Sequence, residues 1–366
     1  MTAQVAQRSD LQSVLEAAIA HGASDVHIRA GNPPLLRVSG QLYPLDLPVL
    51  TERDAAELVG QAMSSEADRL AFDEQHDCDF ALTVEGGGRF RVNAYRARGS
   101  DAMVLRHVRE QVPSLDELGL PRTVRGLALC SGGILLVCGP TGSGKSTSLA
   151  AMVDVINSER RCHILTIEDP IEYLHPNKRS TVSQRELHSD TREFSSALRA
   201  GMRQDPDVVL IGEIRDAETM RTALHAAQTG HFVLASMHAR SVIDVVHRVV
   251  DAFSVDEQRQ IRAAFAESMQ AIICQHLVAS ARGSGRVLTC EIATSTPRVK
   301  EAIADAGKTT GLHEILADGE YYGMHTFEQD LVRLVLAGDV AVADAEAITS
   351  RPADLHVALR RAGHRE

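Results

Sequence analysis

Residues 139–147 combine glycines, a lysine and hydroxyl side chains at a spacing that suits phosphate binding. The segment consists of Gly139, Pro140, Thr141, Gly142, Ser143, Gly144, Lys145, Ser146 and Thr147. Glycines let the backbone curl, so that successive N–H groups point at the phosphates of a nucleotide. Lys145 would reach the phosphate oxygens, and the Ser146 hydroxyl would bind Mg²⁺. The pattern therefore predicts a P-loop that binds ATP together with Mg²⁺.

The elements expected on either side favour a phosphate site over an ordinary glycine-rich turn with an exposed lysine. The apolar run 134–138 predicts a buried strand directly before the loop, and the pattern of 145–157 predicts a helix after it. The N-terminal end of that helix would add its positive dipole to phosphate binding. A strand, a loop and a helix in this order are what a P-loop requires.

Two carboxylates follow apolar runs further along the chain. Glu213 comes just after the predicted strand Val208–Ile211, and Glu168 comes after the predicted strand 162–167. Ligands of open α/β sheets bind outside the carboxyl ends of the strands. We therefore expect Glu213 to bind Mg²⁺ with Ser146, and Glu168 to accept a proton from water. For either carboxylate alone, a helix N-cap or a loop residue is the alternative.

Strand and helix patterns alternate through the middle of the chain. Besides the elements already named, helices are predicted at 194–203 and Ala217–Gln228, and a strand at 232–235. This alternation is typical of a parallel sheet with helices on both faces. Beyond about Asp251 we expect the chain to be mainly helical, with one break at 282–285.

The first hundred residues follow a different pattern and predict a small α+β domain. Helical spacing predicts a helix at 11–21, and Thr51 with Asp54 is a plausible capping pair for a second helix. Strand patterns occur at 25–30, Leu35–Val38, 41–45, 79–84, 89–98 and 103–108, with Gly86, Gly87 and Gly88 as the turn of a hairpin. Pro113, Gly119 and Pro121 then interrupt the pattern, and we interpret 110–121 as a linker between domains.

Length, charge and composition disfavour several classes of function. The 366 residues are enough for two or three domains. The formal charge of −11 disfavours a large nucleic-acid interface, because an acidic chain repels phosphate backbones. No apolar stretch approaches the roughly 20 residues that cross a bilayer, and the N-terminus lacks a signal-peptide pattern. We therefore expect a cytoplasmic protein that contacts the membrane only through protein partners and binds no nucleic acid directly.

The cysteines do not predict a structural zinc site. None of the six, Cys78, Cys130, Cys138, Cys162, Cys274 and Cys290, belongs to a Cys-x-x-Cys pair. We expect free thiols that are mostly buried as small apolar side chains in a reducing compartment.

Four blocks, in order along the chain, resemble the secretion-type ATPases of the GspE/PilT superfamily. Residues 139–147, 166–172, 210–216 and 231–238 resemble their Walker A, Asp box, Walker B and His box. The segments 24–28, 89–93 and 322–329 resemble the PilT- and PilU-like retraction ATPases in particular. The resemblance covers nearly the whole chain. It implies a PAS-like α+β N-terminal domain at 1–109 and an α/β, RecA-like P-loop core with a helical C-terminal tail at 122–366.

The resemblance also implies roles for individual residues. Glu168 would match the catalytic glutamate and Glu213 the Walker B acid, while His231 and His238 would sense the γ-phosphate. Four arginines would stabilise the phosphate charge during transfer, because a guanidinium is a planar and permanently charged fork. They are Arg91, Arg106, Arg199 and Arg203. A solvated basic face is the alternative for the arginines, and an ordinary core or surface position is the alternative for the histidines.

At the level of the molecule, the resemblance implies a homohexamer that couples ATP hydrolysis to pilus retraction and twitching motility. Its expected partners are an inner-membrane platform protein of the pilus and a paralogous pilus ATPase. The stretch 298–305 departs from the retraction signature, which leaves the principal motor and an accessory paralogue both open. The sequence is also compatible with an assembly or type II secretion ATPase, a P-loop kinase or a nucleotide-bound regulatory scaffold.

Overall fold

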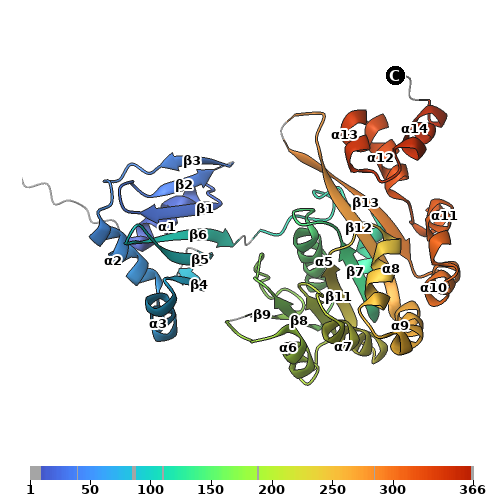
Figure 1. Ribbon diagram of the computed structural model, residues 1–366, viewed down its shortest axis with the longest axis horizontal. Helices are drawn as coiled ribbons and strands as arrows, with labels where there is room; N and C mark the ends of the chain where they lie inside the picture. The colour runs from blue at the N-terminus through green and yellow to red at the C-terminus, as the bar shows by residue number, and fades with distance from the viewer. Residues whose placement is uncertain are drawn as a thin grey trace, which may run out of the picture. The chain divides into compact units, whose positions relative to one another are not determined.

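The computed structural model describes residues 10–38, 40–84, 88–108, 111–187, 189–283 and 285–363. The chain divides into two compact units, 1–111 and 112–366 (Figure 1). The division falls inside the segment predicted as a linker. Leu115 and Leu120, which belong to the same segment, are buried in the core of the second unit. Part of the predicted linker is therefore an integral part of that unit.

The N-terminal unit is built on a six-stranded antiparallel sheet with the order β3-β2-β1-β6-β5-β4. The strands are β1 (Asp25–Arg29), β2 (Leu35–Val38), β3 (Gln41–Pro44), β4 (Asp77–Val84), β5 (Gly88–Ala97) and β6 (Ser100–Val108). Three helices share a core with this sheet: α1 (Leu11–Ala20), α2 (Glu52–Ala62) and α3 (Glu66–Gln75). The predicted capping pair of Thr51 and Asp54 is present at the start of α2. Gly86 and Gly87 of the predicted hairpin turn lie outside the described residues.

Burial alternates along the central strands of this unit, because successive side chains of a strand point to opposite faces. On β5, Phe90, Val92 and Ala94 are buried, whereas Arg91 between them is exposed. One face of the sheet therefore packs in the core, and the other carries polar side chains.

The second unit contains a seven-stranded sheet with the order β13-β12-β7-β11-β10-β8-β9. All neighbours are parallel except β13, which is antiparallel to β12 at one edge. The strands are β7 (Gly133–Cys138), β8 (His163–Glu168), β9 (Thr181–Glu186), β10 (Val208–Ile211), β11 (Phe232–Met237), β12 (Met269–Ala279) and β13 (Arg286–Thr294). The predicted parallel sheet is thus confirmed. The structure adds three strands that were not predicted: the parallel edge strand β9, the parallel strand β12, and the antiparallel strand β13 at the other edge.

Helices cover both faces of this sheet (Figure 1). One face packs against α4 (Thr123–Ala128) and α5 (Lys145–Glu159), and the other against α6 (Phe194–Gly201), α7 (Ala217–Gln228), α8 (Val242–Asp251) and α9 (Val255–Ser268). Strand β7 contributes to both cores in alternation: Leu135 belongs to the first, and Ile134 and Leu136 belong to the second. A strand that is buried on both faces is apolar throughout, which explains the continuous apolar run before the P-loop.

The prediction of mainly helical structure after Asp251 is wrong for Met269–Ala279 and Arg286–Thr294, which form β12 and β13. The first half of β12 is buried on both faces, so its sequence has no two-residue alternation. Periodicity alone does not distinguish such a run from a buried helix. After β13 the described chain is helical, as predicted, with α10 (Pro297–Ala304), α11 (Leu312–Ala317), α12 (Phe327–Leu336), α13 (Val342–Ile348), α14 (Pro352–Arg361) and the short 3₁₀ helices η1 (Thr309–Gly311) and η2 (Glu320–Tyr322). Within the described residues, every helix is too short or too polar to span a membrane.

Candidate nucleotide site

The P-loop connects the end of β7 to the start of α5, as its sequence predicts. Gly139, Gly142 and Gly144 all adopt positive φ angles, of 152°, 78° and 89°, which favour glycine. At Gly139 a Cβ atom would lie only 2.4 Å from the carbonyl oxygen of Gln275. The glycine is therefore required by close packing as well as by its backbone angles. The hydroxyl-bearing side chain of Ser146 is exposed at the start of α5, and Thr147 lies 3.2 Å from the Tyr173 hydroxyl.

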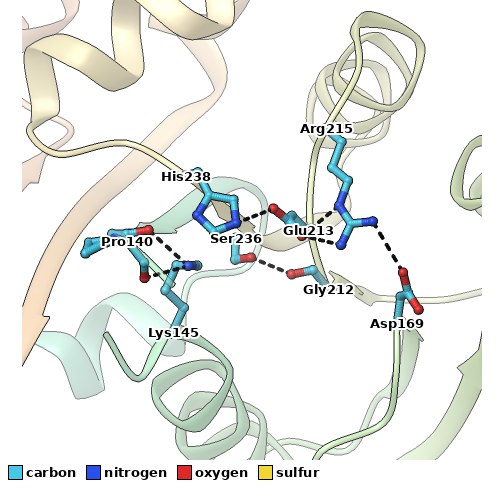
Figure 2. Close-up of polar contacts among 9 residues, drawn as sticks. Pro140, Lys145, Asp169, Gly212, Glu213, Arg215, Ser236 and His238 are labelled. Carbon is cyan, nitrogen blue, oxygen red and sulfur yellow. Dashed lines mark hydrogen bonds and ion pairs between the residues drawn. The ribbon is translucent and has the colours of Figure 1, made fainter. Parts of the chain in front are cut away.

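Lys145 folds back over its own loop. Its Nζ donates hydrogen bonds to the carbonyl oxygens of Gly139, at 3.0 Å, and Pro140, at 3.1 Å (Figure 2). Burial lowers the pKa of Lys145, and the nearby Glu213 carboxylate opposes that effect. The ammonium group is thus held where the loop can receive phosphate oxygens, which would replace the two carbonyls as partners.

Glu213 is the centre of a charged network that follows β10 (Figure 2). One carboxylate oxygen lies 2.7 Å from Nε2 of His238, and the other lies 2.8 Å from Nε of Arg215. Arg215 also reaches the Asp169 carboxylate at 3.4 Å. These contacts raise the pKa of Arg215, mainly through its hydrogen bond to Glu213. The network links the loops that follow three neighbouring strands, β8, β10 and β11.

The parallel register explains why these residues meet. Cys138 pairs with Met237, and Ile211 pairs with both Ala235 and Ile167. The P-loop, His238, Glu213 and Glu168 therefore all lie at the carboxyl-end edge of one sheet. The Ser236 hydroxyl, which donates to the Gly212 carbonyl, fixes β11 to the loop that carries Glu213.

Glu168 ends β8 and has two hydrogen-bond donors. Its Oε1 accepts from the Thr166 hydroxyl, at 2.7 Å, and from the Gln184 amide, at 3.1 Å. Although the side chain keeps some exposure to solvent, burial raises the pKa of Glu168 to about 7, against the lowering effect of both hydrogen bonds. A carboxylate with this pKa can accept a proton near neutral pH and release it again.

The two histidines of the predicted His box lie at opposite ends of β11. His238 follows the strand and contacts Glu213, whereas His231 precedes Phe232, which pairs with Gly133 at the start of β7. The Nδ1 atom of His231 is 3.0 Å from the Ala226 carbonyl oxygen. Within one chain, His231 is therefore not brought to the P-loop edge of the sheet.

Two of the four predicted arginines belong to the N-terminal unit, and the other two lie on α6 or just after it in the second unit. Arg91 and Arg106 face each other on β5 and β6 of the N-terminal unit, where Arg106 forms a 2.9 Å contact with Asp25. Arg199 on α6 pairs with Glu218 at the start of α7. Arg203 donates to the backbone carbonyl of Arg199. Their proposed roles in phosphate transfer remain predictions.

Sequence reasoning missed three residues that the structure connects to the site. Arg215 and Asp169 lie in the Walker B and Asp box blocks, so a search for charges near Glu213 and Glu168 would have found them. Gln275 contacts the P-loop from β12. It carried no sequence signal, because this strand was expected to be helical.

A second cluster, Cys290, His325 and Asp330, has ligand atoms close enough to hold a metal ion. The Asp330 carboxylate is already engaged, however. One oxygen binds Arg333, and the other accepts from the Cys290 N–H and the Thr289 hydroxyl. Burial raises the pKa of Cys290 well above its usual value, which disfavours the thiolate that a metal needs. We interpret the cluster as a hydrogen-bonded part of the core.

A model of the family described as "Type II/IV secretion system protein" matches residues 3–318. The chain is 40% identical to the type IV pilus retraction ATPase PilT of Pseudomonas aeruginosa, over 90% of this chain and 95% of that protein. The chain belongs to the PilT-like ATPases of this family. Another relative, the type IV pilus ATPase PilU of Pseudomonas aeruginosa, is 37% identical over 96% of this chain and 91% of its own length.

A solved structure agrees with this membership. The crystal structure of the pilus retraction motor PilT with bound ADP matches with a TM-score of 0.89 at 40% identity, and the match covers 95% of this chain and 99% of that one. The predicted fold class, with an α/β RecA-like core, is thereby confirmed. The membership also confirms that the chain is an ATPase that binds a nucleotide.

Proposed function

We propose that this chain is a motor that couples hydrolysis of MgATP to retraction of a type IV pilus. The observation that carries the proposal is the convergence of the P-loop, Glu168 and the Glu213–His238 pair at one sheet edge, in a chain that matches PilT along nearly its whole length.

The residues at this edge divide the work of hydrolysis. The P-loop amides and Lys145 bind the phosphates, and Glu168 accepts the proton of the attacking water. Ser146 and Glu213 would hold Mg²⁺, which would neutralise charge on the phosphate oxygens. An exposed hydroxyl and a carboxylate are oxygen ligands of the type that this ion prefers. His238 contacts the same Glu213 carboxylate that would bind the metal. It would therefore respond to the charge at the metal.

The wider assembly is the one that the resemblance to PilT-like ATPases implies. Six copies would form a ring in which Arg91, Arg106, Arg199, Arg203 and His231 complete sites for ATP. Differential affinity for ATP and ADP would then drive closure of one domain on another. The ring would work in the cytoplasm on a membrane-embedded platform protein of the pilus, and a paralogous ATPase would assist it.

The first test measures ATP hydrolysis by the purified chain without any acceptor, with the size of the same fractions determined by light scattering. A hexamer that hydrolyses ATP, loses binding in Lys145→Ala and loses only hydrolysis in Glu168→Gln supports the proposal. A monomer that consumes ATP only when a small acceptor is added would indicate a kinase instead.

The direction of force is tested in the source cells. Deletion of a retraction motor should abolish twitching and leave the cells covered with pili, because assembly continues. Cells without pili would show that the chain is an assembly ATPase. Normal twitching would point to an accessory role.

A further inference from the structure

Gln275 is a fully buried polar residue that contacts the P-loop from a neighbouring strand. Cys274, just before it on β12, pairs with Cys138, the last residue of β7. The register thus places Gln275 level with the start of the loop. Its Nε2 donates a 2.7 Å hydrogen bond to the carbonyl oxygen of Ser143.

The contact between Gln275 and the loop is close at two glycines. A Cβ atom at Gly139 would lie 2.4 Å from the Gln275 backbone oxygen, and one at Gly144 would lie 3.3 Å from Nε2. The backbone of Gln275 is thus packed against Gly139, and its side chain is packed against Gly144.

The hydrogen bond to Ser143 fixes the direction of the next amide. In a planar trans peptide, the C=O and N–H groups point in opposite directions. The Ser143 carbonyl points at Gln275, so the Gly144 N–H points away from it. This N–H makes no hydrogen bond within the part of the chain that the structure describes. It is thus available to an oxygen on the side of the loop away from Gln275.

The Gln275 side chain is not explained by stability alone. Its Oε1 is buried and has no hydrogen-bond partner among the described residues. A buried polar group without a partner costs about 1–3 kcal/mol of folding free energy. A leucine or methionine would fill a similar volume without that cost. A glutamine at this position therefore indicates a role for its donor group.

We propose that Gln275 is a positioning residue that turns the Ser143–Gly144 peptide so that the Gly144 N–H faces the phosphate chain of bound nucleotide. The inference rests on the proposed function, because it takes the loop to be the ATP site. It adds that the β12 strand, outside the four sequence blocks, contributes to recognition of the phosphates. Loss of the Gln275 donor should weaken the binding of ATP and ADP, whereas the binding of adenosine, which has no phosphate, should not change.

The test compares Gln275→Leu with the wild type by calorimetric titration with MgATP, MgADP and adenosine, and by thermal unfolding without nucleotide. We expect the affinity for both phosphorylated ligands to fall about tenfold, equivalent to about 1.4 kcal/mol. The melting temperature should stay the same or rise. In steady state the KM for ATP should rise with kcat nearly unchanged, since the amide contributes to ground and transition states alike.

Gln270→Leu is the matched control. Gln270 lies on the same strand but contacts Gly133, at the start of β7 and away from the P-loop. Its replacement should leave nucleotide affinity unchanged. If Gln275→Leu does not fold, Gln275→Met removes the same donor with a more adaptable side chain.

Two results would overturn the inference. One is a folded variant at Gln275 that binds MgATP and MgADP like the wild type. The other is a variant whose melting temperature falls together with its affinity, which would show a merely structural role. Failure of the wild-type chain to bind MgATP would instead contradict the proposed function itself.

Discussion

Glu168 is the residue whose protonation state should control the rate of hydrolysis. Burial raises its pKa to about 7, so the carboxylate is protonated below that pH and does not accept a proton from water. We expect kcat to fall about tenfold for each pH unit below 7, as for a single essential base. The measurement is a pH–rate profile at saturating MgATP, with nucleotide binding followed in parallel. A profile that stays flat between pH 5.5 and pH 8 would exclude Glu168 as the base.

Arg215 should be required for activity because it holds both Glu213 and Asp169. Arg215→Ala leaves the Glu213 carboxylate with His238 alone and frees the Asp box loop. We expect kcat to fall by about 10–100-fold, the range typical of lost groups that orient a metal ligand. Arg215→Lys keeps a charge but not the fork, and should recover only part of the activity.

Arg221→Ala is the comparison for Arg215. Arg221 is an exposed arginine on α7 that pairs with Glu257 and does not contact the network around Glu213. An equal loss of activity in both variants would mean that the effect is not specific to the site.

The sequence was sufficient to place residues that belong to a motif. The positions of Lys145, Glu168 and Glu213 at one edge of the sheet could be predicted, because they follow from a P-loop and from the ends of two apolar strands. Arg215 and Gln275 could not, since their importance comes from contacts between separate segments. A buried glutamine on a strand without alternation has no local pattern that reveals such a contact.

At the scale of secondary structure, Glu291 links β13 to the start of α8 and should make stability depend on pH. Its Oε1 accepts a 2.7 Å hydrogen bond from the Val242 N–H. Burial raises the pKa of Glu291 from 4.5 to about 7, so the folded state binds this proton more tightly than the unfolded chain does. Stability from this group is full below about pH 4.5 and is lost as the pH rises through 7.

Glu291→Gln keeps the acceptor for Val242 and removes the charge. The variant should lose less stability than the wild type between pH 5 and pH 8, by on the order of 1 kcal/mol or about 2–4 °C in melting temperature. Thermal unfolding at the two pH values measures this difference. Glu314→Gln, on the exposed surface of α11, should behave like the wild type. If Glu291→Gln lost as much stability as the wild type between pH 5 and pH 8, Glu291 would not be the source of this pH dependence.

The elements themselves were predictable to different degrees. Helices such as α7 and strands such as β10 have the predicted bounds, because turn residues and clear periodicity delimit them. Strand β9 was missed, since its sequence is largely polar and only partly buried at the edge of the sheet. Strand β12 was missed for the opposite reason, because its first half is buried on both faces and shows no alternation.

At the scale of the whole molecule, the N-terminal arginines offer a test of whether copies cooperate. Lys145→Ala removes the lysine that is proposed to bind phosphate, and Arg106→Ala removes an arginine of the other unit. If arginines of one copy act on ATP bound by another, a mixture of the two inactive variants should regain up to about a quarter of wild-type activity. The assay is ATP hydrolysis after the variants are mixed and allowed to exchange subunits. A mixture that stays inactive would restrict the arginines to their own chain.

The burial of Leu115 and Leu120 in the core of the second unit has a mechanical consequence. Because half of the predicted linker is fixed there, only a few residues remain between Val108, the end of β6, and the anchored part of the chain. A long flexible linker would extend before it transmitted force, so it would absorb a displacement of one unit. If the chain acts as the proposed motor, a connection of so few residues leaves little length to take up slack, so a displacement of one unit would be passed on to the other.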